Sequence, residues 1–138
     1  MDGPETPAPA KILVSIADAK TTPNDASRAT ALVLANGSME LRWLSPKLAD
    51  PQTPHDRDEL YIVISGTGVF MRAVESCPFD DTILPIQGEE RVTFGPGDAL
   101  FVAAGTVHRF EDFSDDFATW VIFYGPEGGE RRRRGTVK

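Results

Sequence analysis

Short runs of apolar residues recur along this sequence, with glycine, proline, asparagine or aspartate between them. Such runs, bounded by turn residues, are typical of β-strands, and no stretch has the 3.6-residue periodicity of a helix of convincing length. The pattern predicts strands over 29–35, 38–44, 59–65, 69–74, 91–94, 99–103, 107–111 and 117–124, and an edge strand over 11–16. Roughly eight to ten short strands with tight turns predict an antiparallel sandwich or barrel.

Three turn sequences indicate how these strands connect. Asn36-Gly37 between two apolar runs is a strong hairpin signal, because such turns need positive φ at their centre. Gly66-Thr67-Gly68 and Gly95-Pro96-Gly97-Asp98 also place glycine and proline in turn positions. Residues 18–27 and 45–53 are expected to be loops. Residues 75–90 are expected to form an irregular excursion with a short strand near 82–84.

The composition fits one domain. The chain has 138 residues, of which 41% are hydrophobic and 25% charged, enough for one core and too few for two comfortable ones. We expect a single barrel domain over 11–125, a disordered Pro-rich lead-in over 1–10 and a mobile basic tail over 126–138. The four consecutive arginines at 131–134 favour a solubilising role for that tail over contact with RNA.

Charge and cysteine content exclude several functions. A formal net charge of −7 argues against nucleic acid or an anionic membrane as the main partner. Cys77 is the single cysteine, so neither an internal disulfide framework nor a cysteine-based zinc site is expected. The N-terminal residues lack the pattern of a signal peptide, and no apolar run approaches the length of a membrane helix. We therefore predict a cytoplasmic protein that acts on small molecules.

The two histidines indicate a metal site. In a strand, residues of like parity share a face, so His55, Glu59 and Tyr61 point the same way. A charged Glu59 on such a strand is costly to bury unless a cation compensates it. His108 on an adjacent antiparallel strand could reach the same point. The alternative is that His55 is an ordinary loop residue and His108 a hydrogen-bonded strand residue.

Two imidazoles and one carboxylate could bind one divalent transition metal such as Fe, Mn, Ni or Zn. This set leaves coordination positions open for water or substrate. The opposite face of the same strand, with Leu60, Ile62 and Ile64, is also apolar, so another segment or a second subunit should cover it. This two-faced strand predicts a homodimer.

The segments around both histidines resemble the paired motifs of the cupin superfamily. In the first motif, G-x5-H-x-H-x3-4-E-x6-G, His55, Glu59 and Gly66 match the second histidine, the glutamate and the closing glycine. In the second motif, G-x5-P-x-G-x2-H-x3-N, the matches are Gly105 and His108, together with the opening glycine at position 97. The resemblance covers roughly residues 40–124.

The resemblance implies an all-β, cupin-type double-stranded β-helix, or jelly-roll barrel, with a metal near one mouth. It implies that His55, Glu59 and His108 are metal ligands, and that dimers built by sheet packing are frequent. In ligand type the three resemble the facial triad of non-haem iron oxygenases.

The sequence also departs from the family pattern. Thr53 replaces the first histidine of the pair and Lys47 replaces the opening glycine, while Ala103 and Asp112 replace the proline and the asparagine of the second motif. Thr53 is a poor ligand, so Gln52 or a water could complete the metal shell. The same departures leave open that the site binds no metal.

Other residues have both a functional and a structural interpretation. Tyr61 could donate a hydrogen bond to a bound anion, or it could be barrel packing; with Thr53 and Gln52 it forms the predicted substrate-binding set. Arg72 or Arg42 would select a carboxylate if it faced inward, although an exposed arginine is the commoner outcome. Cys77 lacks an available base and is expected to be structural.

The sequence thus supports two main functions. The first is a small metal-dependent enzyme, of oxygenase, isomerase or lyase type, acting on a small polar molecule such as a carboxylate or an enol. The second is a non-enzymatic module that binds a small ligand, with a structural metal or none. A dimeric scaffold without a working site is a third interpretation. Neither the metal nor the reaction follows from the sequence.

Overall fold

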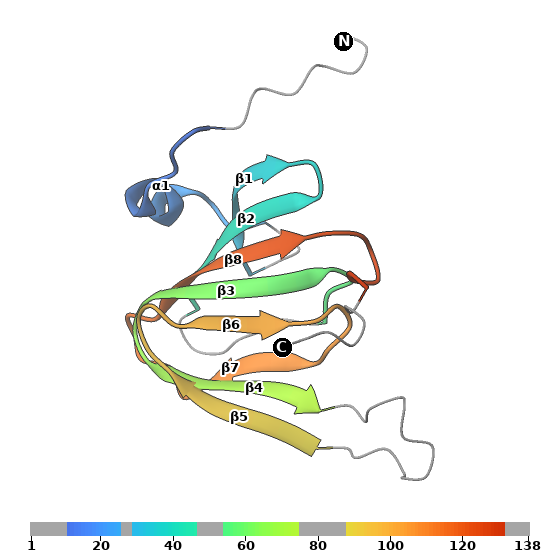
Figure 1. Cartoon of the computed structure of the whole chain (residues 1–138). Coiled ribbons are helices and arrows are strands. Elements are labelled where there is room, and N and C mark those ends of the chain that lie inside the picture. The colour runs from blue at the N-terminus through green and yellow to red at the C-terminus, as the bar shows by residue number, and fades with distance from the viewer. Residues whose placement is uncertain (1–10, 26–28, 47–53, 75–87, 132–138) are drawn as a thin grey trace.

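The computed structural model describes residues 11–25, 29–46, 54–74 and 88–131. In these ranges the chain forms one short helix, α1 (Ile16–Thr21), and eight strands (Figure 1). The strands are β1 (Ala31–Asn36), β2 (Met39–Leu44), β3 (Asp58–Ser65), β4 (Gly68–Val74), β5 (Gly88–Phe94), β6 (Ala99–Val102), β7 (His108–Glu111) and β8 (Ala118–Tyr124).

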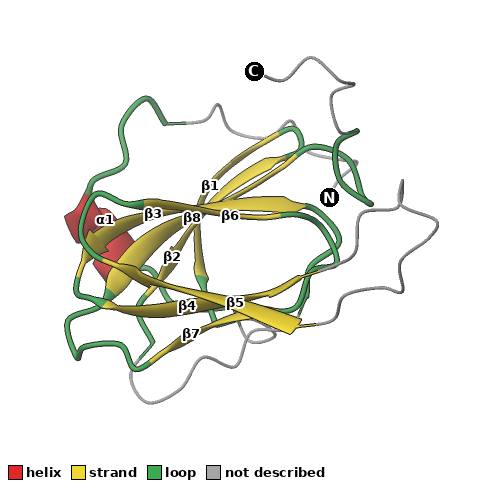
Figure 2. Cartoon of the chain, turned by 60° about the horizontal axis from the view of Figure 1, so that its bottom comes forward, coloured by secondary structure: helices red, strands yellow, loops and turns green. Residues whose placement is uncertain are grey.

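The strands form two antiparallel sheets that face one another (Figures 1 and 2). A five-stranded sheet has the order β1-β2-β8-β3-β6, and a three-stranded sheet has the order β5-β4-β7. Chain segments far apart in sequence are neighbours in the larger sheet, where β8 lies between β2 and β3. The predicted all-β jelly-roll fold is therefore confirmed.

The predicted hairpin between β1 and β2 is present, but its turn is shifted by one residue. Asn36 pairs with Met39, so Gly37 and Ser38 occupy the centre of the turn. Gly37 has a φ of 58°, and Asn36 remains in the strand. A glycine at the first central position suits a two-residue hairpin turn, because that position needs positive φ.

Gly66 closes β3 and turns the chain into β4, as predicted. Its φ is 87°, a conformation that residues with a side chain rarely adopt. A Cβ atom here would overlap the backbone of Phe117. Both the backbone conformation and the close approach of another segment therefore require glycine.

The predicted edge strand over 11–16 was wrong, and the predicted loop over 18–27 was wrong in part. Residues 11–15 form no strand, and part of the predicted loop at 18–27 is helix α1. Ser15 caps this helix, since its hydroxyl accepts the N–H of Asp18 at 3.0 Å and the Asp18 carboxylate accepts the N–H of Ser15. This reciprocal capping box satisfies two backbone donors and fixes the start of a helix.

The irregular excursion predicted over 75–90 is shorter at its C-terminal end, because Gly88 to Glu90 belong to β5. Residues 75–87, with Cys77, lie outside the described residues.

Apolar side chains fill the space between the sheets. Nine of the ten core residues come from β2, β3, β4, β5, β6, β7 and β8, and the tenth precedes β8. They are Leu44, Tyr61, Val63, Phe70, Phe94, Val102, Phe110, Phe117, Val121 and Phe123. Phe110 is central to the aromatic part of this core, since its ring lies 4.7 Å from Phe117 and 4.9 Å from Phe70 between centroids.

A second, smaller cluster lies on the other face of the larger sheet. Ala19 of α1 packs there with Ala31, Trp43 and Ala118. Trp43 and Trp120 meet edge to face with centroids 4.9 Å apart, and Trp43 is buried. Helix α1 therefore covers part of the outer face, for which the sequence predicted cover by another segment or by a second subunit.

Candidate metal centre

Strand β3 carries the first part of the site. Glu59, Tyr61 and Val63 are buried, with at most 1% of each residue exposed, while Leu60, Ile62 and Ile64 on the other face are partly exposed. This confirms the predicted alternation and places the Glu59 carboxylate inside the barrel. The register with β8 and β6 puts Glu59 between Phe123 and Val102, so its immediate cross-strand neighbours are apolar.

His55 lies in the loop just before β3. Its backbone carbonyl accepts the N–H of Gly105 at 2.6 Å, which ties this loop to the turn ahead of β7. Its ring packs edge to face on Phe123, with centroids 4.7 Å apart. The loop is thus held at two points, and the imidazole lies beside the inner face of the sheet.

His108 begins β7 and comes from the opposite sheet. The expectation of a strand adjacent to β3 was wrong, because β3 pairs with β8 and β6 whereas β7 pairs with β4. The histidine reaches Glu59 across the barrel, with Nε2 of His108 3.2 Å from Oε1 of Glu59. Both side chains are only 1% exposed.

The three residues form the predicted cluster. One ligand atom from each of His55, Glu59 and His108 lies within 4.8 Å of the other two. Two ligands on opposite sides of one zinc-sized ion are separated by about 4.2 Å, so this cluster is close to the size that a single ion requires. The rings of His55 and His108 have centroids 5.8 Å apart.

The backbone sets the tautomer of His108. Its Nδ1 lies 2.8 Å from the carbonyl oxygen of Thr106. A carbonyl can only accept, so in the neutral ring the proton is on Nδ1 and the lone pair of Nε2 points to Glu59. Two acceptors 3.2 Å apart repel each other unless a proton or a cation lies between them. Histidines that bind metals commonly donate their second N–H in this manner.

The Glu59 carboxylate lacks a hydrogen-bond donor among the described residues, since neither of its oxygens accepts a hydrogen bond from them. An ionised carboxylate buried among apolar groups is strongly destabilising, whereas a bound cation would offset that cost. The residues present therefore fit a divalent metal.

Beside Glu59, its sequence neighbour Asp58 is also buried but is fully engaged. Its Oδ1 accepts the N–H of Ala104 at 3.0 Å and its Oδ2 accepts the N–H of Glu130 at 2.8 Å. Gly128 also donates its N–H to the carbonyl of Asp56, at 2.6 Å. These bonds attach residues 128–130 to the loop that carries His55. No pattern in the sequence had indicated this role of Asp58.

A charged network also lies on the inner face, next to the site. Glu40 pairs with Phe123 in the register of β2 and β8, and its carboxylate accepts hydrogen bonds from Arg42 at 2.8 Å and Arg57 at 3.1 Å. Burial would raise the pKa of Glu40, but the hydrogen bonds and charges of the two arginines outweigh it and hold that pKa below its usual value. The Arg57 guanidinium lies 5.5 Å from the ring centre of Phe123.

Four other residues were candidates for substrate binding from the sequence: Tyr61, Arg42, Thr53 and Gln52. Tyr61 is fully buried, and its ring packs on Phe110 and Phe70 with centroids 4.9 and 5.6 Å away. Arg42 is buried in the network described above, contrary to the expectation of exposure. Thr53 and Gln52 lie outside the described residues, so their part in substrate binding stays a prediction.

Three known proteins show what the chain resembles. It is 30% identical over 110 residues to "Uncharacterized protein SCO3923" of Streptomyces coelicolor, with 80% of this chain and 90% of that protein covered. It therefore belongs to the same family as SCO3923. No protein-family model matches the chain.

Two solved structures share the fold. A cupin 2 conserved barrel domain protein from Salinispora arenicola superposes with a TM-score of 0.54 at 16% identity, covering 83% of this chain and 90% of that one. This chain therefore has the cupin-type barrel fold. The plu4264 protein from Photorhabdus luminescens superposes on this chain with a TM-score of 0.55 at 17% identity, covering 83% of this chain and 88% of that one. At these identities the likeness concerns the fold.

Helix α1 has six residues. Among the residues that the structure describes, no helix has the length and apolar character needed to cross a membrane.

Proposed function

We propose that this protein is a cupin that binds one divalent transition metal through His55, Glu59 and His108 and is a metal-dependent enzyme. The metal would be Fe, Mn, Ni or Zn, and the substrate a small polar molecule such as a carboxylate or an enol. The observation that supports the proposal most strongly is the Glu59 carboxylate, which is buried, without a hydrogen-bond donor among the described residues, and 3.2 Å from His108 Nε2.

The donor set favours a reactive site over a purely structural one. Structural zinc sites are closed by four protein ligands, whereas catalytic sites keep a position open. Three candidate ligands are present in the described part of the chain, so a bound ion would have room for water or substrate. When bound, such an ion supplies Lewis-acid polarisation of a substrate oxygen or, if it is iron, access to oxygen chemistry.

The protein residues have separate parts in this proposal. Glu59 contributes negative charge that favours a cation over a neutral ligand. The Thr106 carbonyl holds the proton of His108 on Nδ1 and so keeps Nε2 available. Phe123 and Phe70, whose rings contact His55 and His108, exclude water from one side of the cluster and so strengthen its electrostatic interactions.

Metal analysis by plasma mass spectrometry tests the proposal. The purified untagged protein is compared with a His55→Ala/His108→Ala double variant and with Glu111→Gln, which removes a carboxylate bonded to Arg91 on the outer face of β7. We expect near-stoichiometric transition metal in the wild type and in Glu111→Gln, and loss in the double variant. Iron would direct activity assays to oxygen consumption with small acids; zinc, nickel or manganese would direct them to isomerisation or lysis.

A metal-free wild type that stays metal-free after reconstitution would contradict the proposal. The binding-module interpretation would then be favoured, because a ligand could still enter the barrel. Retention of the wild-type metal by the double variant would also contradict the proposal, since the ion would then be bound elsewhere.

We also propose a homodimer, because Leu60 and Ile62 on the outer face of β3 are only partly buried. Light scattering at micromolar concentration should give twice the chain mass of 15.0 kDa. A monomeric mass would refute this part of the proposal without affecting the metal site.

A further inference from the structure

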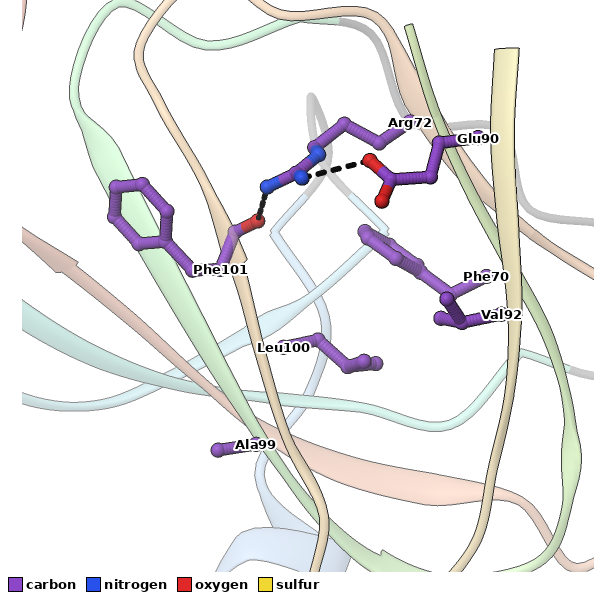
Figure 3. Close-up of a pocket in the computed structure, with 7 residues that line it drawn as sticks. All are labelled: Phe70, Arg72, Glu90, Val92, Ala99, Leu100 and Phe101. Carbon is purple, nitrogen blue, oxygen red and sulfur yellow. Dashed lines mark hydrogen bonds and ion pairs between the residues drawn. The ribbon is translucent and has the colours of Figure 1, made fainter. Parts of the chain in front are cut away.

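A cavity of about 140 Å³ lies where the edges of the two sheets approach one another, between β4 and β5 on one side and β6 on the other (Figure 3). Its walls are Phe70, Val92, Ala99, Leu100 and the backbone of Phe101, and Arg72 and Glu90 form its polar end. Val92 and Phe101 are 42% and 43% exposed, so the cavity is accessible from solvent at this seam.

The polar end lies next to the candidate metal centre. Arg72 of β4 is the direct register partner of His108 on β7 and of Glu90 on β5. Side chains directly opposite each other on antiparallel strands have Cβ atoms about 5 Å apart on the same face. Phe70 connects the two sites further, since it lines the cavity and its ring centroid is 6.1 Å from that of His108.

Arg72 spans the seam between the sheets. It donates through Nη1 to the carbonyl of Phe101 at 3.0 Å and through Nη2 to the Glu90 carboxylate at 2.8 Å. A guanidinium has five N–H donors in a planar fork that matches a carboxylate. Within the described part of the chain only two of the five are used in these bonds, and the carbonyl of Phe101 holds the fork over the cavity.

The hydrogen bond to Glu90 shows that the Arg72 guanidinium binds a carboxylate in this position. The two side chains are 38% and 49% exposed, and ion pairs this exposed are weak because water solvates both charges. A carboxylate on a ligand could therefore replace Glu90 at little cost, particularly if the rest of the ligand gained contact with the apolar walls. Glu90 would then act as a competitor of the ligand.

The walls and the volume limit the rest of the ligand. Phe70, Val92 and Leu100 offer only apolar contacts, which favour a hydrocarbon body over a hydroxylated one. An apolar cavity of about 150 Å³ holds one benzene molecule. The body of the ligand is accordingly a single ring or a short branched chain.

We propose that this cavity binds small monocarboxylic acids with an apolar body, whose carboxylate replaces Glu90 on Arg72. The proposal that the cavity binds such acids depends only on the cavity and its lining residues. The further proposal that these acids are substrates of the metal centre rests on the proposed function. Arg72 is then the residue that determines specificity for an acid, and its position opposite His108 places the head group of the ligand toward the metal centre.

The test is isothermal titration calorimetry with benzoate and 3-methylbutanoate, and with benzamide as the uncharged match to benzoate. Each is titrated into protein stripped with chelator and into protein reconstituted with Zn²⁺. Arg72→Gln removes the fork, and Glu90→Gln removes the competitor but keeps its shape. Arg91→Gln is the charge-matched control, because Arg91 points to the outer face, where it bonds Glu89 and Glu111.

We expect at least one of the two acids to bind the wild type in preference to benzamide. Arg72→Gln should weaken that binding about tenfold or more, since a charged hydrogen-bond pair is lost. Glu90→Gln should tighten it about two- to fivefold, the size of an exposed ion pair, and Arg91→Gln should leave it unchanged. A purely structural Arg72–Glu90 pair would not produce these opposite effects.

No binding of either acid, or equal binding by the wild type and Arg72→Gln, would overturn the proposal. Weaker binding to Glu90→Gln would overturn the competitor role. If the acids bind stripped protein through Arg72 but the protein takes up no metal, the cavity is confirmed as a binding site and the proposed metal function fails, so the two failures are distinguishable.

Discussion

Asp58 and Glu59 are consecutive carboxylates on β3, both at most 5% exposed, yet their environments differ completely. Asp58 accepts two backbone N–H groups, from Ala104 and Glu130. Glu59 points to the opposite face and accepts none from the described residues, while an imidazole nitrogen lies 3.2 Å away.

We infer that this difference separates an acid that stabilises the fold, Asp58, from one that serves the proposed metal site, Glu59. Two charge-assisted hydrogen bonds compensate the burial of Asp58, so its charge stabilises the fold. Glu59 has no equivalent donors among the described residues, and natural proteins tolerate such groups chiefly where a ligand or metal interacts with them. Burial alone does not distinguish the two residues; their hydrogen-bond donors do.

The largest expected effect is on metal binding by Glu59→Gln. The amide keeps the shape but removes the charge, so affinity for Zn²⁺ should fall by more than about 100-fold, exceeding the usual effect of residues that only support ligands. The stability of stripped protein should stay equal or increase, because a buried charge is removed. Titration calorimetry and urea unfolding measure the two quantities; a clear loss of stability with metal affinity unchanged would reverse the assignment.

Asp58→Ala should have the opposite profile. Two buried N–H groups lose their acceptor, so the free energy of unfolding should fall by about 3 kcal/mol. Asp58→Asn keeps one acceptor oxygen and should lose less. Zn²⁺ affinity at a temperature where the variant is folded should change far less than in Glu59→Gln. If urea unfolding shows Asp58→Ala as stable as wild type, the tethering role of Asp58 is wrong.

Gly66→Ala supplies a control at the far end of β3. The new Cβ meets the backbone of Phe117 at a φ of 87°, so the expected loss is about 2 kcal/mol. Thermal unfolding measures the loss, and metal titration should show that it leaves Zn²⁺ affinity nearly unchanged. A parallel loss of metal would mean that general destabilisation mimics the effect of Glu59→Gln.

The smallest expected effect is the pH-dependent contribution of Glu40. Its pKa is lowered in the folded protein, with burial opposed and exceeded by Arg42 and Arg57. The stabilisation is therefore present above the ordinary value of 4.5 and is lost as pH falls through the lower, folded value. At pH 7 Glu40→Gln should be about 1 kcal/mol less stable than wild type.

Urea unfolding from pH 7 to pH 3 measures this difference, which should shrink on the acidic side of 4.5. A constant difference across that range would show that the Glu40 charge contributes no stability. The result also bears on Glu59. Glu40 and Glu59 both pair with Phe123, but among the described residues only Glu40 has arginine partners.

The local pattern predicted what depends on neighbouring residues. The alternation of β3 placed Glu59 and Tyr61 on the inner face, and glycine at position 66 predicted the turn. The apolar run at 11–16 suggested a strand, although Ile12 and Leu13 are exposed. The capping pair Ser15 and Asp18 was visible in the sequence and is a recognised helix signal.

Long-range pairing accounts for what the sequence could not predict. His108 was expected on a strand next to Glu59, but sheet membership depends on which distant segments pair, and β7 joins the other sheet. The donors to Asp58 are Ala104 and Glu130, which lie 46 and 72 positions further along the sequence. No local pattern therefore marks the role of Asp58. The resemblance to the cupin motifs identified the same three metal candidates that the structure brings together.

The most direct test of the account is a crystal structure of Zn²⁺-reconstituted protein, with anomalous data collected on both sides of the zinc edge. The account predicts one strong peak bonded to His55, to Glu59 and to Nε2 of His108, at about 2.0–2.2 Å from each, with Asp58 still bonded to the backbone. A fully occupied zinc bound elsewhere, or no peak beside Glu59 after reconstitution, would contradict it.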